Sequence, residues 1–273
     1  MTRILASAGA EFRIAMRNRW VAIAVAMMAL FSMVLSAAGS APTGVLGVDK
    51  LSVTVASLTS LAVYLVPLVA LLMSFDAVAG EIERGTLPLV LTYPVSRAEL
   101  LLGKFVAHLA ILALAVAVGY GIAAAAALWF DPRASAGLPA LFRLFWTSLL
   151  LGAAFLAIGY ALSAVARRPG AAAGLAIGLW LVMIVLYDLG LLAGVVADAG
   201  GYFTTDIFPW LLIANPADAF RLYNLAASEA TAAAAGIGGA ANTIPAAHAL
   251  ASILLWPLAG LVLATLALRK VTP

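Results

Sequence analysis

Six apolar runs, each about as long as a membrane-spanning helix, constrain the fold of this chain more than any other feature. Crossing a hydrocarbon core of about 30 Å takes about 20 residues in a helix, and a helix satisfies its own backbone hydrogen bonds inside lipid. We therefore predict an all-α integral membrane protein, with residues 1–273 as a single transmembrane domain. The predicted spans are residues 20–38, 53–74, 105–130, 144–166, 171–192 and 246–268.

The composition agrees with this class. The chain is 65% hydrophobic and only 10% charged, whereas a soluble domain carries about 25% charged residues. Its bases lie beside the predicted spans and not in one basic patch, so the net charge of +3 does not indicate nucleic-acid binding. Because the chain has no cysteine, disulfides, thiolate metal sites and cysteine nucleophiles are excluded.

The first span is preceded by an amphipathic segment, residues 3–19. Leu5, Phe12 and Met16 fall on one side of a helical wheel and arginines on the other, which favours a helix lying in the membrane interface. An ordinary basic flank is the alternative. Small residues after the first span raise the possibility of a signal peptide, but residues 20–38 exceed the 7–15 residues or so of a signal core. We interpret them as a retained membrane anchor.

The distribution of bases predicts the orientation. Cytoplasmic flanks of membrane spans carry an excess of Lys and Arg. With six spans, both termini lie on one side, together with 11 of the 15 bases; only Lys50, Arg133, Arg143 and Arg221 fall opposite. We therefore expect both termini and residues 75–104 to be cytoplasmic.

The polar break at residues 75–104 is expected to be a docking surface. It divides into two short amphipathic helices around breaks at Gly85-Thr86 and Tyr93-Pro94, and Ser96 with Glu99 has the spacing of a capping box for the second helix. Two polar helices between two spans offer charge and shape to a partner. The alternative is that the charges only keep a loop solvated.

The segment on the opposite side, residues 193–245, is long for a plain loop. Its apolar stretch 207–213 is expected to re-enter or lie along the outer leaflet, with Trp210 at headgroup depth. A short helix is predicted to follow the Asn215-Pro216 break and to carry Asp218 in its first turn.

Three glycines recur at every fourth position near the start of the fifth span. This spacing predicts a face that packs closely against another helix, either in the same chain or in a second copy. They are Gly170, Gly174 and Gly178.

Catalytic and metal-binding motifs are not found in the sequence. Gly80–Thr86 has the glycine spacing of a Walker A loop, but Thr86 stands where that motif needs lysine. His108 and His248 lie at opposite ends of their spans, so no metal site is predicted. Asp188 is the only acid near the inside of a span, whereas ion-coupled carriers need several such groups. Free energy for any transport must therefore come from a partner.

Four motifs lie in the polar segment and at its end: Gly80-Glu81, Arg84-Gly85-Thr86-Leu87, Tyr93-Pro94-Val95-Ser96-Arg97 and Leu102-Gly103-Lys104-Phe105. Together they resemble the first cytoplasmic loop of ABC-2-type permeases. The resemblance implies the six-span fold of ABC-2 and type V exporters, with residues 3–19 as the elbow helix. It also implies that the loop fits a groove on an ATPase subunit, which binds ATP and Mg, so that this chain is not itself an enzyme. The residues implied in ATPase coupling are Glu81, Glu83, Arg84, Gly85, Thr86 and Arg97.

Further motifs are similar to the NosY-type permeases of nitrous oxide reductase maturation: Arg17–Trp20, Ser57–Ala62, Asp76-Ala77, Pro209–Leu212, Asn215–Asp218 and Arg221-Leu222. This resemblance implies a homodimer in a bacterial inner membrane. Its partners would be a cytoplasmic ABC ATPase (NosF-like) and a periplasmic β-helix protein (NosD-like), with a copper chaperone as a further candidate. The residues implied in contact with the periplasmic partner are Trp210, Asn215, Asp218 and Arg221.

The implied role is assembly of the copper–sulfur centre of the reductase. The permease would move a sulfur or copper species, or transmit a conformational change to the periplasmic partner. One alternative is an ABC-2 exporter of a drug, lipid or polysaccharide. The other is a membrane assembly scaffold that transports nothing.

Overall fold

The all-α prediction is confirmed by the computed structural model, in which the described residues are 8–13, 23, 26–31, 33–34, 50–92, 96–226 and 245–271. Within these ranges there is no strand, and five helices are long and apolar enough to cross a membrane. About half of the predicted first span, residues 20–38, and most of the predicted elbow helix, residues 3–19, lie outside the described residues. The five candidate spans are Leu51–Glu83, Arg97–Phe130, Ala134–Ala166, Pro169–Asp198 and Ala246–Arg269.

The central element of the bundle is α7 (Leu138–Ala166), which packs against α3 (Lys50–Ser74), α6 (Arg97–Phe130) and α13 (Ala246–Arg269). Small residues permit this close packing. A Cβ added at Gly152 would collide with the Leu112 side chain of α6, and one added at Gly159 would collide with Ser74 of α3.

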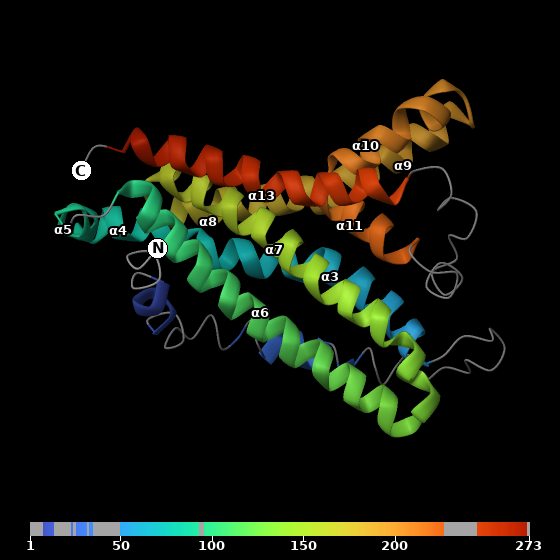
Figure 1. Cartoon of the computed structure of the whole chain (residues 1–273). Helices are drawn as coiled ribbons and strands as arrows, with labels where there is room; N and C mark the ends of the chain where they lie inside the picture. The colour runs from blue at the N-terminus through green and yellow to red at the C-terminus, as the bar shows by residue number, and fades with distance from the viewer. Residues whose placement is uncertain are drawn as a thin grey trace.

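The polar segment lies at one end of the bundle, which we call the loop end (Figure 1). It contains α4 (Asp76–Glu83) and α5 (Thr86–Leu91), joined at Gly85, whose positive φ of 67° suits glycine. The predicted capping box is confirmed: Glu99 N–H donates to Ser96 Oγ, and Ser96 N–H donates to Glu99 Oε2 at 2.8 Å.

The helix that follows this cap is not a second short helix, as the sequence had suggested. Residues 97–104 form the first turns of α6 and continue without interruption into the span. The physical reason is that residues 97–130 contain no proline and no glycine with positive φ that would end the helix. The predicted break at Tyr93-Pro94 lies outside the described residues, which omit 93–95.

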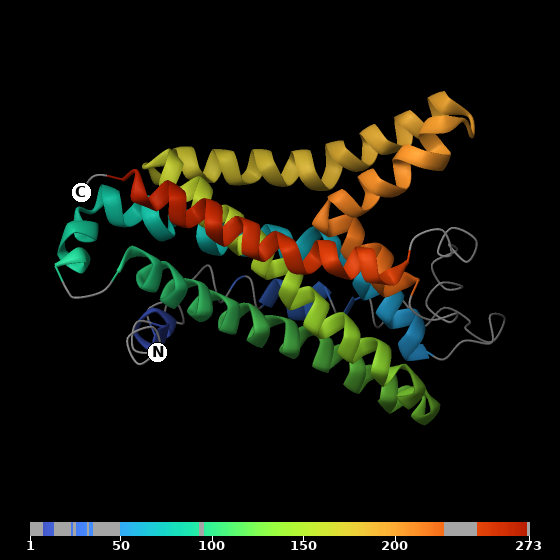
Figure 2. The same ribbon diagram turned by 45° about the horizontal axis from the view of Figure 1, so that its top comes forward.

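At the opposite end, called the hairpin end, the span Pro169–Asp198 leaves the bundle; it corresponds to the predicted fifth span, residues 171–192, and we call it the fifth span. It consists of α8 (Pro169–Trp180), a π-helical segment η3 (Leu181–Leu186) and α9 (Tyr187–Asp198). The chain then turns back toward the bundle through η4 (Phe203–Ile207) and α10 (Phe208–Ala214), so that the two arms form a V (Figure 2). The return ends in α11 (Pro216–Leu225), which packs against α3, α7 and α13.

The glycine face of α8 is open. An added Cβ at Gly170, Gly174 or Gly178 would meet no atom within 4 Å. Neighbouring side chains such as Leu175 and Ile177 are also exposed. Within the described part of the chain no helix occupies this face, and the close packing predicted for it, against another helix of the chain or of a second copy, stays a prediction.

Candidate functional site

The outermost part of the loop end is the tip between α4 and α5. Glu83, Arg84, Gly85, Pro88 and Leu89 are exposed there. Arg84 Nη1 lies 3.6 Å from Asp76 Oδ2, and both side chains are well exposed, so this ion pair contributes little to stability. Leu89 is 65% exposed at the same tip. The tip therefore offers both charge and an apolar side chain to a partner.

Sequence reasoning missed Leu89. The sequence offered one signal: five of the six residues of α5 are apolar. A short helix at the end of a bundle cannot bury all of its faces. The structure buries Leu87, which is 3% exposed, and turns Leu89 outward.

Glu81 faces the interior of the bundle. Its Oε1 lies 2.7 Å from Nζ of Lys104 in α6, and the same ammonium lies 2.6 Å from Oε1 of Glu11 in the helical segment 8–13. Oε2 of Glu81 is buried without a hydrogen-bond partner in the described part of the chain. These three charged groups form a cluster that we call the lysine triad.

The first turn of α4 is held by α7. Ser163 Oγ accepts hydrogen bonds from the backbone N–H groups of Val78 at 3.0 Å and Ala79 at 2.9 Å. The first N–H groups of a helix have no partner within that helix, so a hydroxyl of α7 satisfies two of them. This contact and the lysine triad fix the two ends of α4.

Two more of the residues predicted to contact an ATPase have partners within the chain. Arg97 Nη1 donates to the carbonyl oxygens of Leu268 at 2.7 Å and Val271 at 2.8 Å, which caps the end of α13. Thr86 Oγ1 donates to the Glu81 carbonyl at 3.3 Å. Of the predicted coupling residues, Glu83, Arg84 and Gly85 remain fully on the exposed tip.

A second charge cluster joins the V to the bundle at the hairpin end. Arg221 of α11 donates from both Nη1 and Nη2 to Asp188 Oδ2 of α9 at 3.0 Å, and from Nη1 to Asp218 Oδ1 at 3.2 Å. Asp218 is only 2% exposed. Its burial and the nearby Asp188 carboxylate raise the pKa of Asp218 to about 8.

Asn215 connects the end of α10 to η3. Its Oδ1 accepts the Ala217 N–H at 2.9 Å, which confirms the predicted helix start at Asn215-Pro216. Its Nδ2 donates to the Met183 carbonyl in η3 at 2.6 Å. Asn215 and Asp218 are thus buried in this conformation, and their predicted contact with a periplasmic partner stays a prediction.

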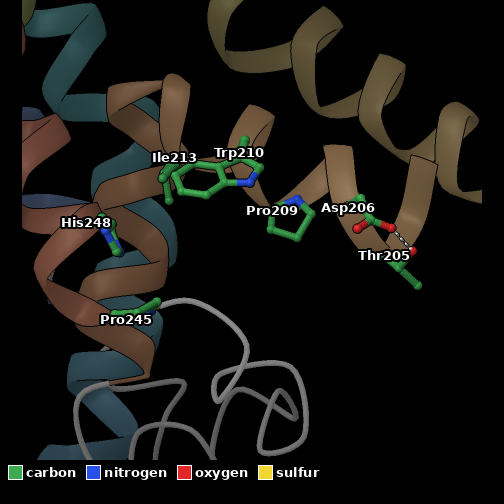
Figure 3. A pocket seen from close by; sticks show the side chains of 7 residues that line it. All are labelled: Thr205, Asp206, Pro209, Trp210, Ile213, Pro245 and His248. Carbon is green, nitrogen blue, oxygen red and sulfur yellow. Dashed lines mark hydrogen bonds between the residues drawn. The ribbon is translucent and has the colours of Figure 1, made fainter. Parts of the chain in front are cut away.

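Trp210 is the most exposed of the four residues predicted to contact that partner, at 63%. It lies over His248 at the start of α13, with ring centroids 5.8 Å apart, and both rings line an open cavity of about 250 Å³ (Figure 3). The other histidine, His108, accepts or donates a hydrogen bond of 2.6 Å with Tyr160 in α7. The two histidines therefore have separate surroundings.

The fold is that of a multi-pass membrane protein with an exposed charged tip at one end of its helix bundle. A family model described as "ABC-2 family transporter protein" matches residues 5–271, so the chain belongs to the ABC-2 transporter family. It is a multi-pass permease subunit of an ABC transporter, and the ATPase is a separate partner of such permeases.

Two curated relatives carry the same printed name, "Probable ABC transporter permease protein NosY". The protein from Pseudomonas aeruginosa is 47% identical over 253 residues, covering 91% of each chain. The protein from Stutzerimonas stutzeri is 40% identical over 279 residues, covering 99% of each chain.

Proposed function

We propose that this chain is the membrane subunit of an ABC transporter that serves maturation of nitrous oxide reductase. The observation that carries the proposal is the likeness to the NosY permeases, because 99% coverage includes the outer segment 193–245. That segment discriminates better than the coupling loop, which exporters of other substrates share. The chain would act as a homodimer in the bacterial inner membrane, with both termini in the cytoplasm.

An ATPase subunit would dock at the tip between α4 and α5. Glu83 and Arg84 offer charges of opposite sign, which can set the register of a partner groove. Leu89 offers an exposed apolar side chain whose burial in a partner groove would be favourable. ATP and Mg would be bound by that partner.

A periplasmic partner would contact the hairpin end. Trp210 and the adjacent cavity are open there, and Arg221 is partly exposed beside the V. Asp188 ties α9 to α11, and Asn215 ties η3 to the end of α10. A change in the angle between the arms of the V would therefore alter this surface. The system would assemble the copper–sulfur centre of the reductase, aided by a copper chaperone.

Complementation tests this role. A nitrous-oxide-reducing bacterium lacking its own permease gene should make reductase without the visible absorption of the copper–sulfur centre, and this chain should restore it. The variant Leu89→Glu should fail, because a buried carboxylate at the ATPase contact would be desolvated without a partner. Restored drug, lipid or polysaccharide export with no effect on the centre would contradict the proposal.

Transport assays in sealed vesicles containing the complex address what is moved. ATP-dependent movement of a sulfur or copper species would identify a cargo. ATP hydrolysis with neither movement would favour transmission of a conformational change to the periplasmic partner. If the membrane subunit has no influence on ATP hydrolysis, the chain is a scaffold.

A further inference from the structure

The lysine triad joins three segments that are distant in the sequence. Lys104 lies in α6, Glu81 in α4 and Glu11 in the segment 8–13. Only 6% of the lysine side chain is exposed. Removing charged groups from water costs free energy, and the attraction between the paired charges is often smaller than this cost. A buried ion-pair cluster is therefore weak evidence for a purely stabilising role. A role in positioning explains its composition better.

The triad holds the end of α4 nearest the docking tip. Glu81 is in the last turn of α4, and Glu83 on the exposed side follows two residues later. The other end of α4 is held by Ser163 of α7. A force applied at the tip therefore reaches α6 through Lys104 and α7 through Ser163.

The third member of the triad extends this connection to the amino-terminal segment. Phe12 packs against Ile111 of α6, as does Met73 of α3, so segment 8–13 lies against the bundle. Glu11 and Glu81 both point at the same ammonium group. Without that positive charge the two carboxylates would repel each other, which disfavours the approach of α4 to segment 8–13.

We propose that Lys104 is a positioning residue that couples α4 to segment 8–13, so that displacement of α4 by the ATPase moves this segment together with α6. The proposal rests on the proposed function, because it takes the α4–α5 tip as the ATPase contact. It assigns Glu81 to transmission inside the permease and leaves docking to the exposed tip residues.

The test uses the complex of this chain with its ATPase subunit. Because the chain has no cysteine, Ala10→Cys provides a single attachment point for a fluorescent probe on segment 8–13. ATP should change the probe signal in the otherwise unaltered complex. Lys104→Met should retain the ATPase subunit and lose the ATP-dependent signal, whereas Lys104→Arg should keep it. Lys270→Met, the same substitution at an exposed lysine, should behave as the unaltered complex.

An unchanged ATP-dependent signal in a Lys104→Met complex that retains its ATPase would overturn the proposal. If Lys104→Met does not assemble, the variant Glu11→Gln tests the proposal instead, because it removes only the ion pair with segment 8–13. Loss of the ATP-dependent signal in Glu11→Gln supports the proposal. An unchanged signal overturns it. Failure of the docking site itself is a different result. Full retention of the ATPase subunit by Leu89→Glu would show that the ATPase does not dock at the α4–α5 tip. Coupling through Lys104 would then have no starting contact.

Discussion

Glu81 and Glu83 stand two positions apart on α4 and face different surroundings. Successive residues of a helix turn by about 100°, so these side chains point about 200° apart. Glu81 lies against Lys104, and Glu83 is exposed at the tip. The two acids resemble each other in the sequence, yet one belongs to the interior and the other to the surface available to a partner.

Charge reversal at these two positions should therefore have different effects. Glu81→Lys places a second ammonium beside Lys104 and should lower the free energy of unfolding by about 3 kcal/mol, as for other broken buried pairs. Glu83→Lys should change stability by less than about 0.5 kcal/mol, as expected of a surface substitution, while weakening retention of the ATPase subunit. Thermal unfolding and co-purification measure the two effects. Loss of the ATPase from Glu81→Lys at unchanged stability would contradict this assignment.

The buried acid Asp218 should make stability depend on pH. Its pKa is about 8 in the folded chain against an ordinary value of 3.8, so the folded form binds a proton that the unfolded form lacks between these values. Stability should then fall as pH rises toward 8, by at most about 1.4 kcal/mol per pH unit, and level off above it.

Thermal unfolding in detergent between pH 5 and pH 9 measures this effect. Asp218→Asn stays neutral at every pH, so it should flatten the dependence of stability on pH. The control Asp206→Asn removes an exposed acid of η4 and should leave that dependence unchanged. A profile in Asp218→Asn as steep as that of the unaltered chain would show that another group titrates.

At the scale of elements, short segments determine how the long helices are placed. The π-helical segment η3 lies in the middle of the fifth span, where the Met183 carbonyl accepts a hydrogen bond from Asn215. Tyr187 in α9 donates to the Leu211 carbonyl in α10 at 2.6 Å. Together these bonds connect the outgoing and returning arms of the V.

Variants of Asn215 should separate its two hydrogen bonds. Asn215→Ser retains an oxygen that can cap α11 but is too short to reach Met183, whereas Asn215→Ala loses both contacts. Loss of a helix cap costs about 1 kcal/mol, so Asn215→Ala should unfold at a lower temperature than Asn215→Ser. Hydrogen exchange in η3 should rise in both variants. Equal protection of η3 in all three proteins would mean that Asn215 does not hold the π-helical segment.

At the scale of the whole molecule, α7 forms the centre and the fifth span lies mostly at the edge. Gly152 of α7 is enclosed by its neighbours, whereas Gly174 of α8 faces open space. Gly152 therefore permits close packing inside the chain, whereas Gly174 lies on a surface that no described residue covers. Figure 2 shows the separation of the fifth span from α13 toward the hairpin end.

Leucine substitutions at these two glycines should test for a second copy. Gly174→Leu has space within one chain, so it should leave thermal stability of the monomer unchanged and weaken association of two copies. Gly152→Leu should destabilise the chain itself, because a side chain added at Gly152 would collide with Leu112 from its first carbon onward. Light scattering after gel filtration in detergent measures the assembly. A stable dimer in Gly174→Leu would exclude this face from the interface.

The orientation in the membrane can be tested with single cysteines at the two ends. Leu89 at the loop end and Tyr202 at the hairpin end are both well exposed, so Leu89→Cys and Tyr202→Cys are accessible labelling sites. An impermeant thiol reagent added from the periplasmic side should label only Tyr202→Cys. Labelling of Leu89→Cys in intact inner membranes would reverse the predicted topology.

Much of the architecture was predictable from local patterns in the sequence. The length of an apolar run is sufficient to identify a membrane span. The three-residue spacing of Ser96 and Glu99, and the Asn215-Pro216 pair, identify helix starts, because a cap bonds within its own first turn. Such signals depend on neighbouring residues alone, and each of these helix starts is present in the structure.

Only the tertiary structure decided which charged residues face inward. Lys104 meets Glu11 across 93 positions, and Arg97 reaches the Leu268 carbonyl across 171. Arg221 likewise meets Asp188 on another arm of the chain. No local spacing links such partners, because their approach depends on how whole helices pack against α7. For the same reason the sequence by itself identified a charged loop, whereas the fold separated the residues of its interior from those of its exposed tip.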